Sequence, residues 1–107
     1  MNDFEYLADI ADLPEGALLG VQRSNGDDVC LYNYRGSIGA IGNVCTHAEF
    51  LMSDGSLQNG AVIECVWHGA RFDLQTGRVR RGPAEDPLPV FPVRIGGERV
   101  LVGPRTL

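Results

Sequence analysis

The sequence has no long apolar run and no sustained helical periodicity, and both absences narrow the class of protein. None of the apolar runs in its 107 residues approaches the length that crosses a membrane. No segment keeps a 3.6-residue apolar period beyond two turns, so long amphipathic helices are not expected. The acidic N-terminal stretch, residues 1–16, also lacks the features of a signal or transit peptide. We expect one cytoplasmic domain built mainly from strands.

Positive charge is in deficit, and several catalytic patterns are missing. Nine basic against fourteen acidic side chains give a formal net charge of -5, which disfavours binding to nucleic acid or anionic lipid. The chain shows no paired carboxylates, serine nucleophile elbow or phosphate-binding glycine loop, so neither hydrolysis nor nucleotide binding is indicated. A partner protein is the better expectation than nucleic acid or a membrane.

What the sequence does have is a series of strand-length apolar runs separated by glycine-bearing turns. This pattern is typical of an antiparallel all-β fold, either a sandwich or a small barrel. One helical turn is expected in residues 11–17, with Asp12 as its N-cap and Pro14 in its first turn. The segments 45–56 and 80–89 are expected to be long loops, which often carry function. The expected strands are residues 17–23, 29–34, 38–44, 61–66, 70–74, 89–95 and 99–103.

Three cysteines cannot all pair with one another, and a reducing compartment argues against a disulfide. Cys30 lies in the run VCLYNY with no basic residue closely before it, and is expected to be a small buried side chain. The other two belong to matching motifs, C-T-H at residues 45–47 and C-V-W-H at 65–68, with seventeen residues between them. Each motif offers one thiolate and one imidazole.

Two thiolates and two imidazoles suit either of two metal centres. They form an acceptable tetrahedral zinc shell, and they are also the Rieske ligand set, in which the cysteines hold one iron of a [2Fe–2S] cluster and the histidines the other. Structural zinc sites usually group their cysteines in one knuckle, whereas here each motif supplies one residue of each kind. The mixed order therefore favours the binuclear centre, and zinc stays open as the alternative.

The motifs and the residues around them resemble the Rieske-type ferredoxins of bacterial aromatic-ring-hydroxylating dioxygenase systems, such as the carbazole and biphenyl dioxygenase ferredoxins. The resemblance covers nearly the whole chain, including CVWHGARFD, the Q-T-G turn after it and the terminal FPVRI. It implies a base formed by residues 1–41 and 83–107 and an inserted cluster-binding part, about 42–82. It also implies that Gly82 and Pro83 lie on a third loop that closes over the cluster. The implied inner-iron ligands are Cys45 and Cys65, and the implied outer-iron ligands are His47 and His68.

The same resemblance implies a function without substrate chemistry. Such ferredoxins are soluble carriers, expected here as a monomer, that pass single electrons from an NAD(P)H-dependent flavoprotein reductase to the Rieske centre of a terminal oxygenase. A small nitrite-reductase-type Rieske subunit and a zinc-stabilised interaction module are the alternatives. A catalytic oxygenase is excluded because about 100 residues fill one domain and leave no room for a mononuclear iron site.

Departures from the respiratory Rieske pattern predict the potential of the cluster. Phe50 and Trp67 stand where those proteins have an additional disulfide, and Ala70 and Phe72 stand where they have a hydroxyl-bearing Ser and Tyr. Hydrogen bonds to the sulfurs stabilise the reduced cluster, so their loss predicts a potential near the low end of the Rieske range, about -150 mV.

Residues beside the motifs are candidates for partner contact. Phe50, Trp67 and Pro83 are expected to form an apolar patch with Glu49 as a charge at its rim, the alternative being that the two aromatic rings pack inward. Glu64 and Asp73 are expected to fix the geometry of the second motif. The one local basic group is read as a solvated strand face, with docking to an acidic patch as its alternative. Its members are Arg71, Arg78, Arg80 and Arg81.

Overall fold

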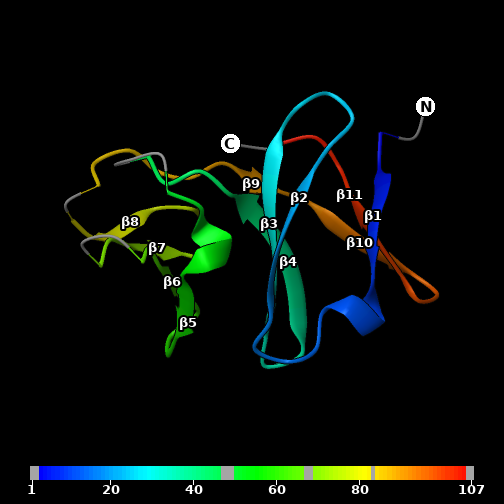
Figure 1. The fold of residues 1–107 in the computed structure, drawn as a ribbon, viewed down its shortest axis with the longest axis horizontal. Helices are drawn as coiled ribbons and strands as arrows, with labels where there is room; N and C mark the ends of the chain where they lie inside the picture. The colour runs from blue at the N-terminus through cyan, green and yellow to red at the C-terminus, as the bar shows by residue number, and fades with distance from the viewer. Residues whose placement is uncertain (1–2, 47–49, 67–68, 83, 106–107) are drawn as a thin grey trace.

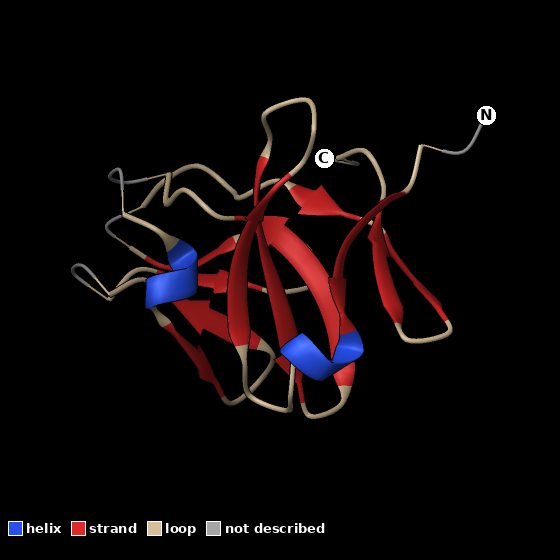
Figure 2. Ribbon diagram, turned by 45° about the vertical axis from the view of Figure 1, so that its right-hand side comes forward, coloured by secondary structure: helices blue, strands red, loops and turns tan. Residues whose placement is uncertain are grey.

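The computed structural model describes residues 3–46, 50–66, 69–82 and 84–105, which form three antiparallel sheets (Figures 1 and 2). Within these ranges the helical segments are the short 3-10 turns η1 (Ile10–Asp12) and η2 (Met52–Asp54), and none is long and apolar enough to cross a membrane. In order across each sheet, the first contains β1 (Glu5–Asp9), β11 (Arg99–Val102) and β10 (Val93–Gly96); the second contains β2 (Leu18–Gln22), β3 (Asp28–Tyr34), β4 (Ser37–Gly42) and β9 (Val90–Phe91); the third contains β5 (Ser56–Gln58), β6 (Val62–Glu64), β7 (Arg71–Asp73) and β8 (Val79–Arg81).

Strand β3 separates two hydrophobic cores, because successive side chains on a strand point to opposite faces. Val29 and Leu31 belong to the core between the first two sheets, together with Phe91, Val100 and Val102. The residues that alternate with them face the other way, into a core shared with the third sheet. That second core contains Cys30, Tyr32, Ile41, Met52, Ile63, Phe72 and both motif cysteines, Cys45 and Cys65.

The third sheet lies beside the second and forms the left side of the molecule in Figure 1. Its inward-facing pair, Ile63 and Phe72, is fully buried against the second core. The Tyr32 hydroxyl of β3 lies 3.4 Å from the carbonyl oxygen of Leu74, just after β7, and so connects the two sheets. The loops that carry the two motifs project from this side.

The antiparallel all-β prediction is confirmed, while several element boundaries are corrected. The helical turn expected over residues 11–17 is wrong: it spans Ile10–Asp12, with Asp9 as its N-cap. Asp12 lies at the end of that turn, where a carboxylate oxygen accepts the Asp9 backbone N–H at 3.1 Å. Pro14 follows the turn rather than beginning it.

Three strands have no counterpart among the expected ones. β5 and β8 contain three residues each, too few to show a period of two in the sequence. β8 also ends inside the expected loop 80–89, so that Arg80 and Arg81 are strand residues. β1, the third, lies within the acidic N-terminal stretch. The expected strand 89–95 is divided at Pro92, which cannot donate a ladder hydrogen bond, into β9 and β10.

Candidate metal centre

The two motifs lie in loops that are closed in the same way. In loop 1 (residues 45–50) the Cys45 N–H donates to the carbonyl oxygen of Phe50 at 2.9 Å, and in loop 2 (residues 65–70) the Cys65 N–H donates to that of Ala70 at 2.7 Å. Each cysteine thus begins its loop and is fixed by a hydrogen bond to the residue five positions later. Gly69 in loop 2 has a φ of 69°, in the left-handed region that glycine adopts without steric cost. The two cysteines therefore occupy equivalent positions.

Both motif cysteines are buried in one core. Cys45 is 3% exposed and Cys65 is 1% exposed, and neither forms a disulfide. A pair of buried thiols at the bases of two equivalent loops matches the half-site in which two thiolates hold one iron away from water. The residues that the structure describes therefore fit the thiolate side of a [2Fe–2S] centre.

Cys30 shares that core but belongs to neither motif. It is fully buried on β3, as predicted, and burial raises the pKa of its thiol to about 12. Its side chain points from a strand into the core rather than standing at the base of a loop. We therefore read Cys30 as a packing residue.

Five of the predicted site residues fall outside the described ranges. They include the two imidazole ligands, and the four-residue ligand set is for this reason seen only in part. Among residues 3–46, 50–66, 69–82 and 84–105, no group of three or more His, Cys, Asp or Glu side chains is arranged to hold a metal ion. The predicted residues outside these ranges are His47, Glu49, Trp67, His68 and Pro83.

Loop 1 is held by polar contacts that the sequence did not indicate. The Thr46 hydroxyl donates to the carbonyl oxygen of Asp86 at 2.7 Å, which connects loop 1 to the described residues of loop 3 (residues 82–88). The side-chain oxygen of buried Asn43 accepts the Ser53 backbone N–H at 2.8 Å, and the backbone carbonyl of Asn43 accepts the Met52 N–H at 2.6 Å. Asn43 comes directly after β4, where an Asn side chain can bond to backbone groups in place of a neighbouring strand. An Asn at the end of an apolar run was therefore the sequence feature that could have indicated this contact.

Loop 2 is held by the hairpin from which it grows. β6 leads into the loop and β7 leaves it, and the Glu64 carboxylate pairs with the Arg71 guanidinium at 2.6 Å across its neck. Asp73 accepts the backbone N–H groups of Gln75 and Thr76 at 2.9 and 3.0 Å and so shapes the next turn. Although partial burial raises the pKa of Asp73, these hydrogen bonds and Arg80 outweigh it and hold that pKa below its usual value. The ion pair of Glu64 agrees with its expected role beside the second motif, whereas Asp73 orders the turn that follows the motif.

Apolar side chains are exposed around both loops. Phe50 is 38% exposed, so its ring is neither fully packed nor fully free of the protein. Three further exposed residues lie beside or within the motifs and were not singled out from the sequence, because short apolar runs do not show which side chain faces water. We call this set the tip patch: Val44, Phe50, Leu51 and Val66.

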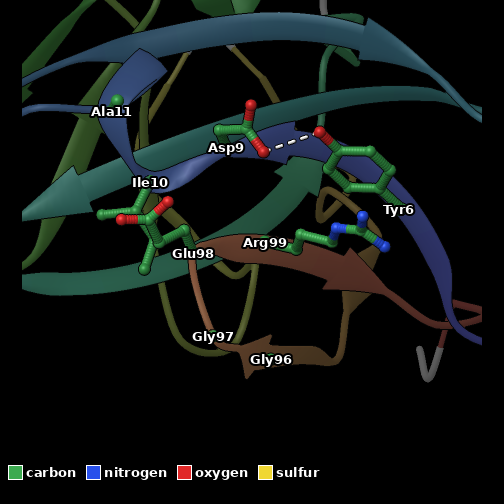
Figure 3. A pocket seen from close by; sticks show the side chains of 8 residues that line it. All are labelled: Tyr6, Asp9, Ile10, Ala11, Gly96, Gly97, Glu98 and Arg99. Carbon is green, nitrogen blue, oxygen red and sulfur yellow. Dashed lines mark hydrogen bonds between the residues drawn. The ribbon is translucent and has the colours of Figure 1, made fainter.

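A pocket lies at the other end of the molecule, away from the loops (Figures 1 and 3). It lies between η1 and the turn that joins β10 to β11. The Tyr6 hydroxyl donates to the Asp9 carboxylate at 2.6 Å, and the guanidinium of Arg99 lies 4.9 Å from the centre of the Tyr6 ring. The polar side chains that line this pocket are thus already paired with one another, except that of Glu98.

Comparison with known proteins places this arrangement in a family. Residues 4–92 match the model of the Rieske [2Fe-2S] domain. A relative is the ferredoxin component of the naphthalene 1,2-dioxygenase system of Pseudomonas aeruginosa, 43% identical over 91 residues, which cover 85% of this chain and 86% of that protein. The chain belongs to the Rieske [2Fe-2S] domain family, and the zinc alternative is set aside.

Solved structures share this fold, and one of them comes from a dioxygenase system. A chain of the complex of reduced oxygenase and oxidized ferredoxin in carbazole 1,9a-dioxygenase matches with a TM-score of 0.89 and 29% identity, over 100% of this chain and 99% of that one. The small subunit of a putative NADH-dependent nitrite reductase from Mycobacterium tuberculosis has a TM-score of 0.86 at 24% identity, over 97% and 96% of the two chains, and shares the fold alone. This protein is a Rieske-type ferredoxin with a [2Fe–2S] cluster, an electron-transfer component rather than a catalytic one.

Proposed function

We propose that this ferredoxin passes single electrons from an NAD(P)H-dependent flavoprotein reductase to the Rieske centre of a terminal ring-hydroxylating oxygenase. The observation that supports this most directly is the pair of equivalent, buried cysteines at the bases of two loops on one side of the molecule. The names of the relatives support the dioxygenase setting, since the naphthalene protein is a ferredoxin component and the carbazole complex joins a ferredoxin to an oxygenase.

The proposed ligand set divides between the two loops. Cys45 and Cys65 hold the inner iron, and His47 and His68 hold the outer iron. The cluster, when bound, accepts and releases one electron without a change of substrate bonds. The chain excludes water from the thiolate side through the second core, and the backbone hydrogen bonds within the two loops fix the separation of each cysteine from its loop end. The division of the chain into a base and an inserted part, about 42–82, belongs to the same proposal.

The surface through which the electron leaves is proposed to be the tip patch. Its exposed apolar side chains are the kind that form the centre of a transient protein interface. Glu49, Trp67 and Pro83 are included in the proposed contact surface because of their positions in the sequence, next to the motifs and in loop 3. Phe50 belongs to both sets, and its partial exposure supports a contact role.

A low potential is the second part of the proposal. Ala70 and Phe72 are both fully buried in the core that contains Cys65. Neither side chain has a hydroxyl group, so neither can donate a hydrogen bond to the sulfurs. With fewer hydrogen bonds to stabilise the reduced state, the midpoint is expected near about -150 mV. A potential of this size suits electrons supplied by a nicotinamide-dependent reductase.

The test uses the purified holoprotein with components of the naphthalene and carbazole dioxygenase systems. We expect a Rieske electron paramagnetic resonance signal after dithionite reduction, reduction by at least one flavoprotein reductase with NADH or NADPH, and onward transfer to at least one oxygenase. A midpoint above zero would overturn the low-potential proposal. Reduction without transfer to any oxygenase, combined with support of nitrite reduction, would favour the nitrite-reductase-type subunit.

A further inference from the structure

Three charged residues form a row across the third sheet at the end nearest the loops. Glu64 ends β6, Arg71 begins β7 and Arg81 ends β8, and the register pairs Glu64 with Arg71 and Arg71 with Arg81. Glu64 and Arg71 alternate with buried Ile63 and Phe72 and so lie on the opposite face of the sheet, and a register shift between Arg71 and Phe72 sets Arg81, rather than Arg80, opposite Arg71. Cys65 follows Glu64 directly and Gly82 follows Arg81, so the row borders loops 2 and 3. We call it the loop-end row.

The charges of the loop-end row do not balance. Glu64 neutralises Arg71 through the 2.6 Å ion pair, but Arg81 is exposed and directly opposes Arg71. Like charges opposed across a sheet are destabilising. Arg81 forms no ion pair with any of the residues that the structure describes, whereas Arg80 beside it pairs with Asp73 at 2.9 Å. The row thus keeps a net positive charge that destabilises the sheet locally. Residues that destabilise the fold in this way are expected mainly at functional sites, and Arg81 is therefore a candidate for a functional contact.

The rest of the chain makes this charge distinctive. Residues 42–82 contain four acidic and four basic side chains, whereas the remainder contains ten acidic and five basic ones. All of the net negative charge therefore lies outside the part that carries the loops. The residues outside 42–82 repel an acidic partner surface, whereas the Arg81 guanidinium, directly before loop 3, attracts it. This charge asymmetry therefore favours an encounter at the end of the molecule that carries the loops.

We propose that the Arg81 guanidinium, with Arg71 beside it, receives a carboxylate on the surface of the terminal oxygenase when the tip patch docks. The inference rests on the proposed electron transfer to an oxygenase. The tip patch and the loop-end row meet at loop 2, where Val66 and Glu64 flank Cys65, so a partner on the tip patch lies beside the row. A planar guanidinium binds a carboxylate through two parallel hydrogen bonds, which fixes orientation as well as proximity. The oxygenase is the occupant because the carbazole relative is solved as a complex with its oxygenase.

The first test compares Arg81→Gln with Arg78→Gln. Arg78 is exposed on the same hairpin but lies at its opposite end, beside the turn 75–77. Arg78→Gln therefore removes the same charge at a place remote from the loop-end row. With the oxygenase that the wild-type protein reduces fastest, R81Q should lower the second-order rate of electron transfer by about threefold to tenfold at low ionic strength. R78Q should have a much smaller effect. Reduction of R81Q by the reductase should stay within about twofold of wild type, the scatter expected when no contact is lost.

Two controls separate docking from structure. If Arg81 only stabilised the sheet, R81Q would unfold at a lower temperature; we expect an equal or higher unfolding temperature, because the opposition to Arg71 is removed. The midpoint potential of R81Q is measured as well, so that a change in driving force is not taken for a change in binding. A rate loss explained by the shifted potential, or a clear loss of stability, overturns the proposal.

The second test uses the absence of lysine from this chain. Arg81→Lys keeps the charge and adds the only side-chain amine, which a zero-length carbodiimide can couple to a carboxylate of the partner. Mass spectrometry should find a link from position 81 to an Asp or Glu of the oxygenase, and no link from position 78 in the matched R78K variant. A link from position 81 to the reductase instead, or equal links from both positions, overturns the assignment. If the wild-type protein reduces no oxygenase, the proposed function fails; if it does and R81Q matches it, this inference alone fails.

Discussion

Loops 1 and 2 share one closure but are supported in different ways. Each begins with a buried cysteine whose N–H bonds to the carbonyl five residues later. Loop 2 continues the hairpin of β6 and β7, so its neighbours in space are also its neighbours in sequence. Among the described residues, the strand pairing that flanks loop 1 is the isolated bridge between Val44 and Leu51. Loop 1 depends on contacts with distant residues instead.

The difference shows how one site can be assembled from local and non-local parts. Loop 1 reaches loop 3 through the Thr46 hydroxyl and the carbonyl oxygen of Asp86, forty positions later in the sequence. The segment that follows loop 1 also meets the strand that precedes loop 2: Gly55, directly after η2, packs against the backbone of Glu64 at the end of β6. Changes at these places should therefore affect the two loops unequally, although their cysteines are equivalent.

The largest effect should come from the cysteines themselves. Cys45→Ala and Cys65→Ala should each abolish the visible absorption and the iron content of the purified protein, because either removes one of two thiolates from the same iron. Cys30→Ala is the matched control: it removes a fully buried thiol from the same core and should leave a full cluster with somewhat lower stability. A variant of Cys45 or Cys65 that retained a normal cluster would break the equivalence of the two loops.

The next effect tests the contact between the segment after loop 1 and the end of β6. A Cβ at Gly55 would collide with the carbonyl oxygen of Glu64, which belongs to β6 and cannot rotate away. Gly55→Ala should cost about 1–3 kcal/mol of unfolding free energy, the range seen when a group is forced into a packed site. Denaturant unfolding measures this cost. Gly96→Ala, whose Cβ would make only an ordinary 3.5 Å contact with Leu101, should be far milder. Equal losses in both variants would show that close packing of Gly55 on β6 does not hold these two segments together.

The local part of the site was the part that the sequence could predict. Cys65, Glu64 and Arg71 lie within eight positions of one another on an alternating hairpin, so their motif spacing and their strand pattern point to the same place. The proposed role of Cys45 rests on the same kind of spacing. The burial of Cys30 followed from its position in an apolar strand.

The non-local part could not be predicted, since it depends on how distant segments pack. No sequence rule joins Thr46 to Asp86 or shows that β3 divides two cores. β5 and β8 were missed because three residues show no periodicity, and with β8 the register that opposes Arg71 and Arg81 was missed too. The basic group was visible in the sequence, but its imbalance appears only when the strands are paired.

A smaller effect tests the non-local support of loop 1. Thr46→Val keeps the shape of the side chain and removes the hydroxyl that bonds to the carbonyl oxygen of Asp86 at 2.7 Å. The expected cost is about 0.5–1.5 kcal/mol, as for a typical hydrogen bond. The holoprotein should also lose its cluster faster on dilution into a chelator, followed by visible absorption. Thr46→Ser, which keeps the hydroxyl, should restore the wild-type rate; failure to do so would mean that the methyl group rather than the hydrogen bond matters.

The smallest effect sharpens the electrostatic support of loop 2. Glu64→Gln removes the carboxylate that balances Arg71, and it leaves Arg71 opposed to Arg81 without compensation. Because the pair is partly exposed, the loss should be only about 0.5 kcal/mol, and it should shrink as salt is raised. In a double-mutant cycle the cost of Glu64→Gln should be lower when Arg81 is already Gln, because one of the two opposed positive charges is then absent. The Thr46→Val cost, which depends on a neutral hydrogen bond, should not change with salt. A strictly additive cycle would mean that Arg81 has no electrostatic interaction with the Glu64–Arg71 pair, although the register of the strands sets Arg81 opposite Arg71.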